Sequence, residues 1–420
     1  MSYIDLKYAP DDNDMLTLFY IEPSKGISFP KACEHVTGES SIGTWTDVST
    51  MKDEVRENLQ PHVYWMDEKK GLAKIAYPLE LFEPSNVPQI MSSIAGNIYG
   101  MKAIENLRLL DIGFPRAVLK AHKGPHFGVS GVREVLEVSE RPLVGTIVKP
   151  KVGLDSQQHA DVAYGSWLGG CDIVKDDENL TDQPFNRFED RVIKTLEARD
   201  KAYSETGEQK VYMANITAET SEMIRRMEFI KDHGGRYAMI DVVTLGFSAV
   251  QTVRMHEIGL VLHAHRAMHA ALTRNKSHGI TMLALAKIYR MIGVDQLHIG
   301  TAVGKMEGPM REVMAIRDAI VEDDVRMDEF VLPQKWYGMK PVFPVSSGGM
   351  HAGIVPPLMD FMGKDVIIQA GGGVHGHPDG TVAGAKSMRQ AVDAVLEGVS
   401  LEDYARDHEE LRKALKKFGK

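Results

Sequence analysis

The sequence predicts an α/β protein, in which a (β/α)8 TIM barrel with C-terminal helices is preceded by an α+β N-terminal domain with a small antiparallel sheet. Two observations lead to this fold class. After about residue 140, short apolar segments alternate regularly with amphipathic helical ones, a pattern typical of a parallel sheet that is buried on both faces. The first 140 residues instead mix short β-prone and helical segments without such a repeat. A chain of 420 residues is long enough for more than one domain.

The N-terminal part is expected to hold a modest antiparallel sheet with helices. Its predicted strands and helices are Leu16–Tyr20, Val63–Trp65, Ser28–Val36 and Val87–Gly96. Between Leu119 and Arg133, His, Lys, Gly and Pro replace the periodic apolar residues, which indicates a hinge. We therefore predict an N-terminal domain over residues 1–125 and a catalytic barrel over residues 126–420.

The second part contains eight strand-like segments with helical patterns between them. The strands are Leu143–Val148, Cys171–Val174, Val211–Ile216, Ala238–Val243, Leu260–Ala264, Gln296–Ile299, Val342–Val345 and Val366–Gln369. The helical patterns include Ser221–Lys231, Met282–Met291 and Lys386–Leu396. Eight such units predict a closed barrel. A doubly wound open sheet is the alternative, but it normally has fewer strands, and no Gly-x-Gly-x-x-Gly turn follows the first one.

Composition excludes several classes of protein. A formal net charge of −9 provides no global basic field, so we expect no nucleic-acid partner. Two cysteines, Cys33 and Cys171, cannot form a disulfide framework or a zinc ribbon and fit a reducing compartment. No apolar run reaches the roughly 18 residues that a membrane helix needs. We therefore expect a cytoplasmic protein without a membrane partner.

Ionisable and glycine-rich segments follow six of the eight predicted strands. Because the chemistry of a (β/α)8 barrel lies at the carboxyl ends of its strands, we expect these segments to share one mouth. In chain order they are Lys149-Pro-Lys151, Lys175-Asp-Asp177-Glu178, His263 to Arg266, His298 to Lys305, Ser346 to Gly349 and Gly371-Gly372-Gly373.

The carboxylates Asp177 and Glu178 suit Mg²⁺, a hard cation that prefers oxygen ligands. The structural alternative is a solvent-exposed helix N-terminus, where the helix dipole stabilises acidic side chains. Two carboxylates make a sparse metal site, and Lys175 cannot add an oxygen ligand as an ammonium ion.

The remaining segments each have a functional and a structural interpretation. Glycines after the seventh and eighth strands, Gly348-Gly349 and Gly371-Gly372, are either simple turns or phosphate-binding loops. His263, His265 and His269 are either packing residues or site residues. From the residues alone, the set indicates a Mg²⁺-dependent enzyme that acts on a small phosphorylated substrate through an enolate or another oxyanion. A metal-dependent aldolase fits this description.

The motifs resemble those of the large subunit of ribulose-1,5-bisphosphate carboxylase/oxygenase (Rubisco), most closely its archaeal form III branch, over nearly the whole chain. The matching segments are GTIVKPKVGL (145–154), GGCDIVKDDEN (169–179), HAHRAMHA (263–270), GTAVGKMEG (300–308), SGG (347–349), QAGGG (369–373), ESSIGTWT (39–46) and Gly96-Asn97.

The resemblance implies a role for each matching residue. Lys175 becomes a carbamate by reaction with CO₂ and then binds Mg²⁺ beside Asp177 and Glu178. Lys149 moves protons with electrostatic support from Lys151, His265 takes part in acid–base chemistry, and Lys305 closes over the site on a mobile loop. The implied substrate contacts are Arg266, His298, Ser347, Gly348, Gly349, Gln369, Gly371 and Gly372, with Glu39, Thr44, Trp45 and Asn97 coming from the partner subunit.

The implied reaction adds CO₂ and water to ribulose 1,5-bisphosphate to give two molecules of 3-phosphoglycerate, with a competing oxygenase activity. The implied assembly is a homodimer or a ring of dimers without a small subunit, and the implied pathway is salvage of AMP ribose. A Rubisco-like enolase or isomerase without net carboxylation is the alternative, as is a non-enzymatic protein that kept only the fold. One departure is visible: Ile147 stands where plant-type chains carry threonine, so no hydroxyl contact is assigned there.

Overall fold

The computed structural model describes residues 2–44, 46, 48–301 and 310–419, and these form two compact units. The first unit comprises residues 1–124, 268–293 and 322–339, and the second comprises residues 125–267, 294–321 and 340–420. The domain boundary predicted between residues 125 and 126 stays a prediction. No helix among the described residues is both long and apolar enough to cross a bilayer.

The second unit contains the predicted barrel. Its eight parallel strands close in the order β11-β14-β15-β5-β6-β7-β8-β9. Their bounds are β5 Leu143–Ile147, β6 Ile173–Lys175, β7 Val211–Asn215, β8 Tyr237–Asp241, β9 Val261–His265, β11 Gln296–His298, β14 Phe343–Ser347 and β15 Ile367–Gln369. Each overlaps one of the eight strands expected from the sequence, so the barrel prediction is confirmed.

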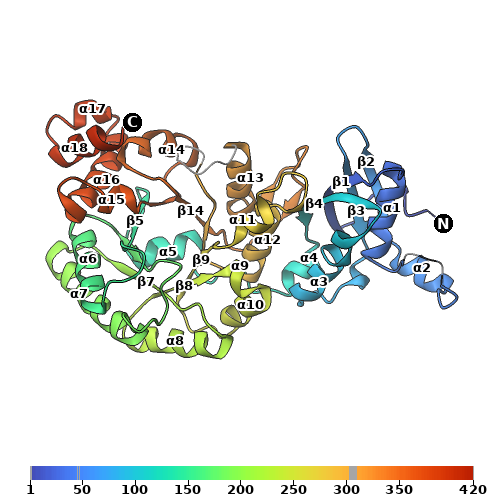
Figure 1. Ribbon diagram of the computed structural model, residues 1–420, viewed down its shortest axis with the longest axis horizontal. Helices are drawn as coiled ribbons and strands as arrows, with labels where there is room; N and C mark the ends of the chain where they lie inside the picture. Colours follow the sequence, from blue (N-terminus) through green and yellow to red (C-terminus); the bar gives the residue numbers. More distant parts are fainter. Residues whose placement is uncertain (1, 45, 47, 302–309, 420) are drawn as a thin grey trace. The chain divides into compact units, whose positions relative to one another are not determined.

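Helices flank the strands on the outside of this barrel, as Figure 1 shows for α6, α7 and α8. The helices of the second unit are α5 Gly128–Leu136, α6 Ser156–Leu168, α7 Phe188–Thr206, α8 Thr220–Asp232, α9 Val242–Leu245, α10 Phe247–Met255, α13 Met310–Val321, η3 Ala352–Ile354, α14 Val355–Met362, α15 Gly372–His375, α16 Gly380–Leu396, α17 Leu401–Tyr404 and α18 Glu409–Phe418. Helix α6 begins with a capping box in which Asp155 accepts from backbone N–H groups and Gln158 reaches back to the cap.

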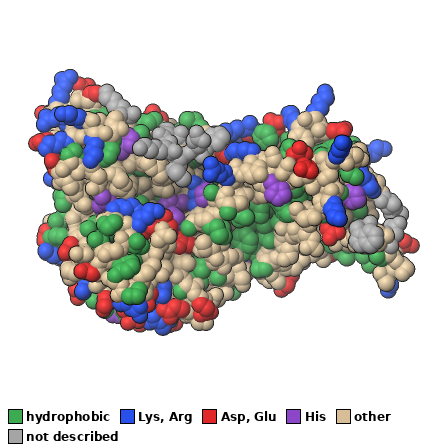
Figure 2. All heavy atoms as spheres, in the orientation of Figure 1, with side chains coloured by type: hydrophobic (Ala, Val, Ile, Leu, Met, Phe, Trp, Pro, Cys, Tyr) green, Lys and Arg blue, Asp and Glu red, His purple; other side chains and the backbone are tan. Residues whose placement is uncertain are grey.

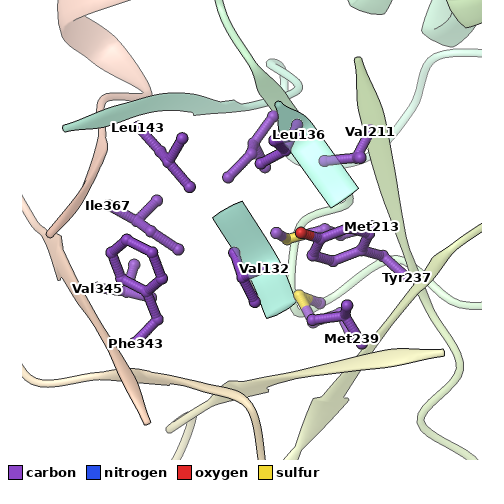
Figure 3. Close-up of a cluster of buried hydrophobic side chains, with 12 residues drawn as sticks. Val132, Leu136, Leu143, Val211, Met213, Tyr237, Met239, Phe343, Val345 and Ile367 are labelled. Atoms are coloured by element: carbon purple, nitrogen blue, oxygen red, sulfur yellow. The ribbon is translucent and has the colours of Figure 1, made fainter. Parts of the chain in front are cut away.

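Helix α5 covers the amino-terminal end of the barrel. Its Val132 and Leu136, one helical turn apart, pack in a cluster with the first residue of nearly every strand, as Figure 3 shows for Leu143, Val211 and Phe343. This helix begins at Gly128, inside the segment expected to be a hinge. Because one end of the barrel is filled by apolar side chains, the polar residues at the carboxyl ends of the strands form its open mouth.

The first unit is built on a five-stranded sheet in the order β10-β4-β1-β3-β2. Its elements are β1 Met15–Pro23, α1 Phe29–Glu39, α2 Asp53–Leu59, β2 His62–Asp67, β3 Leu72–Tyr77, η1 Leu79–Leu81, α3 Val87–Ile94, η2 Asn97–Gly100, β4 Ile104–Gly113, α4 Arg116–Lys120, α11 His269–Thr273, β10 Gly279–Ile280, α12 Met282–Ile292, β12 Asp324–Val325 and β13 Gln334–Lys335. The four longer strands pair antiparallel as predicted, and β10 adds a short parallel edge from a distant part of the chain.

A buried ion pair holds helix α12 against strand β4 in this unit. Nζ of Lys287 lies 2.6 Å from Oδ2 of Asp111, and neither side chain is exposed. The same ammonium also donates to the carbonyl oxygen of Ile112. The predicted helix Met282–Met291 is α12, which follows barrel strand β9 and precedes β11 in the chain and belongs to the first unit.

Candidate active site

Those predicted site residues of the barrel that the structure describes lie at or just after the carboxyl ends of its strands. Lys175 is the last residue of β6, and Asp177 and Glu178 follow it directly. Lys175 and Asp177 are buried, whereas the Glu178 side chain is 24% exposed and reaches the mouth. On the face of this unit that Figure 2 shows, basic, acidic and histidine side chains gather. The structure therefore brings these sequence-predicted residues together.

Three lysines surround the two carboxylates. Nζ of Lys149 lies 2.7 Å from Oδ2 of Asp177, and Nζ of Lys151 lies 3.7 Å from Oε1 of Glu178. Nζ of Lys175 lies 4.0 Å from Oε2 of Glu178 and donates to the carbonyl oxygen of Asp176. Burial lowers the pKa of Lys175 despite the neighbouring carboxylates, so its amine loses a proton more readily than an exposed lysine does.

The carboxylate of Asp176 points away from the other two and anchors the loop that carries them. It accepts hydrogen bonds from the Arg191 guanidinium, the Tyr212 hydroxyl and the backbone N–H of Asn215. His159 Nε2 lies 3.1 Å from its Oδ1. Burial opposes the charge of Asp176, but these partners together hold its pKa below the ordinary value. Lys175 and Asp177 on either side are therefore fixed by a fully buried network.

His265 lies between two acids. Its Nδ1 is 3.1 Å from Oδ1 of Asp241, and its Nε2 is 3.7 Å from Oε2 of Glu178. Burial alone would raise the pKa of Glu178, but the neighbouring Lys175 and His265 side chains hold it below its ordinary value. Asp241 was not among the predicted site residues, although it is the last residue of β8. Asn215, the last residue of β7, is likewise a polar residue at a strand end that was not among the predicted site residues.

His298 and Ser347 meet at the ends of β11 and β14. Nδ1 of His298 lies 2.7 Å from Oγ of Ser347, and the ring of His298 lies edge-on to His265. Burial lowers the pKa of Arg266 to about 10, which still leaves this guanidinium cationic at neutral pH. It packs over Gly300, where a Cβ atom would lie only 2.8 Å from one guanidinium nitrogen.

The glycines after β14 and β15 leave room in the mouth of the barrel. Gly348 and Gly349 have φ values of 105° and 72°, which L-residues rarely adopt. A Cβ atom on Gly371 would lie 3.2 Å from Cε of Lys149, so this loop runs beside the lysine. The buried amide of Gln369 has no hydrogen-bond partner among the described residues.

Four predicted contacts belong to the first unit or fall outside the described residues. Glu39 ends α1, Thr44 lies in the segment after it, and Asn97 begins η2. Glu39 and Thr44 line a cavity of about 920 Å³ within this unit. Trp45 lies outside the described residues, and so does Lys305.

The donor set agrees with a magnesium site that includes a modified lysine. Among the described residues, no group of three or more His, Cys, Asp and Glu side chains is placed to hold a metal ion. Asp177 and Glu178 supply carboxylate oxygens, and Lys175 lies beside them with its pKa lowered by burial. A carbamate on Lys175 would add the anionic oxygen that the two carboxylates lack.

Comparisons with known proteins match both parts of the chain. The family model "Ribulose bisphosphate carboxylase large chain, catalytic domain" matches residues 128–418, and the model of the N-terminal domain of that large chain matches residues 2–118. Ribulose bisphosphate carboxylase of Methanocaldococcus jannaschii is 58% identical over 424 residues, which cover 99% of both chains. The enzyme of Methanosarcina barkeri is 56% identical over 100% of this chain and 99% of that one.

Solved structures agree with these matches. The dimeric archaeal Rubisco from Hyperthermus butylicus superposes with a TM-score of 0.94 at 45% identity, covering 99% of this chain and 98% of that one. The octameric ribulose-1,5-bisphosphate carboxylase/oxygenase from Pyrococcus horikoshii superposes with a TM-score of 0.91 at 48% identity and the same coverage.

Proposed function

Because the chain belongs to the ribulose bisphosphate carboxylase large-chain family, we propose that it adds CO₂ and water to ribulose 1,5-bisphosphate to give two molecules of 3-phosphoglycerate, with a competing oxygenase reaction. One observation carries the proposal. A fully buried lysine, Lys175, lies 4.0 Å from Glu178 and two residues before Asp177, at the open end of a barrel. A buried amine beside two metal-binding carboxylates is suited to carbamylation by CO₂ and to Mg²⁺ binding afterwards.

Mg²⁺ held by carbamylated Lys175, Asp177 and Glu178 would supply Lewis-acid stabilisation of a substrate oxyanion. The chain's own residues do the rest. Lys149, whose ammonium contacts Asp177, is the proposed carrier of the proton during enolisation, and exposed Lys151, beside Glu178, is proposed to support it electrostatically. His265, held by Asp241, contributes acid–base chemistry at the hydration and cleavage steps.

The bisphosphate substrate requires two anion sites across the mouth. On one side, Arg266 and His298 are the proposed phosphate contacts, and Ser347 is the proposed contact to the sugar. On the other side, the loop glycines supply backbone N–H groups, with Gly348, Gly349, Gln369, Gly371 and Gly372 as the proposed contacts. Lys305 is proposed to close over the site and to stabilise the new carboxylate.

We also propose that two subunits share each active site. Glu39, Thr44, Trp45 and Asn97 would complete the site of the partner subunit in a homodimer or a ring of dimers. The relatives from Hyperthermus butylicus and Pyrococcus horikoshii are described as dimeric and octameric. The similarity to archaeal enzymes supports a form III assignment, and with it a role in salvage of AMP ribose.

The test is product formation by the purified full-length protein. After incubation with MgCl₂, labelled bicarbonate and ribulose 1,5-bisphosphate, label is expected in 3-phosphoglycerate. Lys175→Ala is the matched control, since Asp177 and Glu178 remain, and its rate should fall at least a hundredfold, about 2.7 kcal/mol of activation free energy. A wild-type protein that forms no labelled 3-phosphoglycerate would refute the proposal. A Lys175→Ala variant that keeps more than about a tenth of the rate would refute the carbamate role.

A further inference from the structure

Three polar side chains of the second unit, Thr146, His375 and Thr381, form a hydrogen-bonded clasp behind the glycine loop Gly371-Gly372-Gly373. Oγ1 of Thr146, in strand β5, donates to the carbonyl oxygen of Ala370 at 2.7 Å. Nε2 of His375, at the end of helix α15, lies 3.0 Å from the same Oγ1, and its Nδ1 lies 3.1 Å from Oγ1 of Thr381 in helix α16. The clasp therefore links β5, α15 and α16, which lie next to one another in Figure 1.

The direction of the two central hydrogen bonds follows from the atoms that form them. A carbonyl oxygen cannot donate, so the single hydrogen of the Thr146 hydroxyl lies toward Ala370. Only lone pairs of Thr146 Oγ1 then remain for His375, so Nε2 of His375 carries a hydrogen and donates it. The backbone N–H of Ala370 also donates to the carbonyl oxygen of Gly145, in β5, at 2.9 Å. Both polar backbone groups of Ala370 are therefore bonded to β5.

The far end of the glycine loop is fixed by close packing instead. A Cβ atom on Gly373 would lie 2.3 Å from the carbonyl oxygen of Met350, so no side chain fits there. Gly372 differs, because it is exposed and a Cβ atom on it would meet nothing within 4 Å. Gly371 runs beside Lys149. The loop is thus held at its two ends, while Gly371 and Gly372 between them border the open mouth.

We propose that Thr146 and His375 are positioning residues that hold the glycine loop beside Lys149 in the shape that receives an anionic group of the substrate. The inference rests on the proposed function for the identity of that group, a phosphate of a sugar bisphosphate. Thr146 acts through the carbonyl of Ala370, a fully buried residue, and His375 acts through the Thr146 hydroxyl. A buried carbonyl that loses its donor is costly, so the peptide turns toward another donor and the loop N–H groups move with it.

The first test measures the shape of the loop in the full-length protein without any ligand. The N–H groups of residues 374–376 donate to the carbonyl oxygens of Gly371 and Gly372, so their hydrogen exchange reports whether the loop keeps its shape. By mass spectrometry, this exchange should be at least tenfold faster in Thr146→Val than in the wild type. It should stay within threefold of the wild type in Thr146→Ser, which keeps the hydroxyl. Strand β7 is the internal reference and should exchange at the wild-type rate in both. Wild-type exchange of the loop in Thr146→Val would overturn the proposal.

Two substitutions of His375 provide a second matched pair, which carries the test even if Thr146→Val does not fold. His375→Gln keeps an N–H donor for Thr146 and should exchange within threefold of the wild type, whereas His375→Leu lacks the donor and should exchange at least tenfold faster. Because His375 acts through Thr146, the double variant Thr146→Val/His375→Leu should exchange no faster than Thr146→Val alone. An acceleration equal to the product of the two single effects would overturn this order of action, and wild-type exchange in His375→Leu would overturn the role of His375.

The second test measures the consequence for anion binding. Ribitol 1,5-bisphosphate, which has two phosphates and no reactive carbonyl, is titrated into the protein by calorimetry. Its Kd should rise at least tenfold in Thr146→Val and His375→Leu and less than threefold in Thr146→Ser and His375→Gln. The affinity for Mg²⁺ in bicarbonate buffer should stay within threefold in all four variants, because the clasp contacts none of the proposed metal ligands.

Two results of this titration would overturn the proposal. One is an equal Kd for the bisphosphate in the wild type and all four variants. The other is a parallel loss of Mg²⁺ affinity, which would show general damage to the barrel. If the wild-type protein does not bind the bisphosphate, the proposed function fails instead, and the hydrogen exchange measurement still decides whether the clasp holds the loop.

Discussion

The ammonium group of Lys149 and the buried carboxylate of Asp177 form an ion pair, with Nζ 2.7 Å from Oδ2. The Asp177 side chain is only 1% exposed, so this lysine compensates a buried charge at the mouth. The pair joins the proposed proton carrier to a proposed metal ligand. A divalent cation held by Asp177 would therefore compete with the ammonium of Lys149 for this carboxylate, and the ion pair would be weakened.

This competition predicts opposite effects of one substitution on metal binding and on turnover. Lys149→Met should raise the affinity for Mg²⁺ in bicarbonate buffer about three- to tenfold, because an ion pair worth about 1 kcal/mol is removed. Carboxylation should fall at least a thousandfold. Calorimetric titration with MgCl₂ gives the affinity, and Lys364→Met, which removes an exposed lysine paired with Glu140, is the control. A lower Mg²⁺ affinity in Lys149→Met would contradict the competition.

Sharing of the active site between subunits is tested by mixing inactive variants. Glu39→Gln in the first unit and Lys175→Ala in the barrel should each inactivate the homodimer. A hybrid dimer would combine one intact Glu39 with one intact Lys175, so exchange should restore up to about a quarter of the wild-type activity of the mixture. Native mass spectrometry confirms that hybrids have formed. Inactive mixtures with confirmed hybrids would show that each subunit completes its own site.

Helix α15, which follows β15, provides a pH-dependent contribution to stability through its last residue, His375. The two ring nitrogens of His375 contact the hydroxyls of Thr146 and Thr381, at 3.0 and 3.1 Å. Burial is the main reason that the pKa of His375 is lowered to about 4. Between about pH 6.5, where the unfolded chain takes up this proton, and pH 4, where the folded protein does, the free energy of unfolding falls as the pH falls. Above pH 6.5 the contribution is complete and constant.

We therefore expect His375→Asn to lose less stability on acidification than the wild-type protein does. By pH 4.5 the difference should reach about 2.5 kcal/mol, the integral of the proton uptake between the two pKa values. Urea unfolding at pH 7.5 and pH 4.5 measures it. His256→Asn, at an exposed histidine after α10, is the control and should keep the wild-type acid dependence. Equal acid dependence in His375→Asn and wild type would show that His375 contributes nothing.

The barrel could be predicted from the sequence because its strands are buried on both faces. Such strands are continuous apolar segments, and the polar residues that end them are easily located. The same reasoning predicted that Lys175, Asp177, Glu178 and His265 lie together at the carboxyl end of the barrel, where the structure places them.

Other features depend on contacts that leave no local pattern. Helix α5 begins in a segment rich in His, Gly and Pro, and only Asp295, which accepts from the N–H groups of Phe127 and Gly128, shows why it starts there. Gln296 has the sequence pattern of an ordinary first residue of a strand, yet its Oε1 lies 2.8 Å from Nδ1 of His263 on the adjacent strand β9. A metal-binding role for Lys175 could be predicted only from the family resemblance, because an unmodified ammonium ion does not bind a metal.

The last prediction separates a carboxylase from an enolase on the same scaffold. Enolisation requires Lys149 and the metal site, whereas CO₂ addition also requires a cation near the new carboxylate, the role proposed for Lys305. Lys305→Ala should therefore still exchange the C3 proton of ribulose 1,5-bisphosphate with solvent, at no less than about a tenth of the wild-type rate, and lose at least a hundredfold in 3-phosphoglycerate formation. Both rates are measured in one preparation, with Lys149→Met, which should lose both, as the control. If proton exchange and 3-phosphoglycerate formation fall by the same factor in Lys305→Ala, this lysine has no separate role in carboxylation. A wild-type protein that exchanges the proton without forming 3-phosphoglycerate would be an enolase.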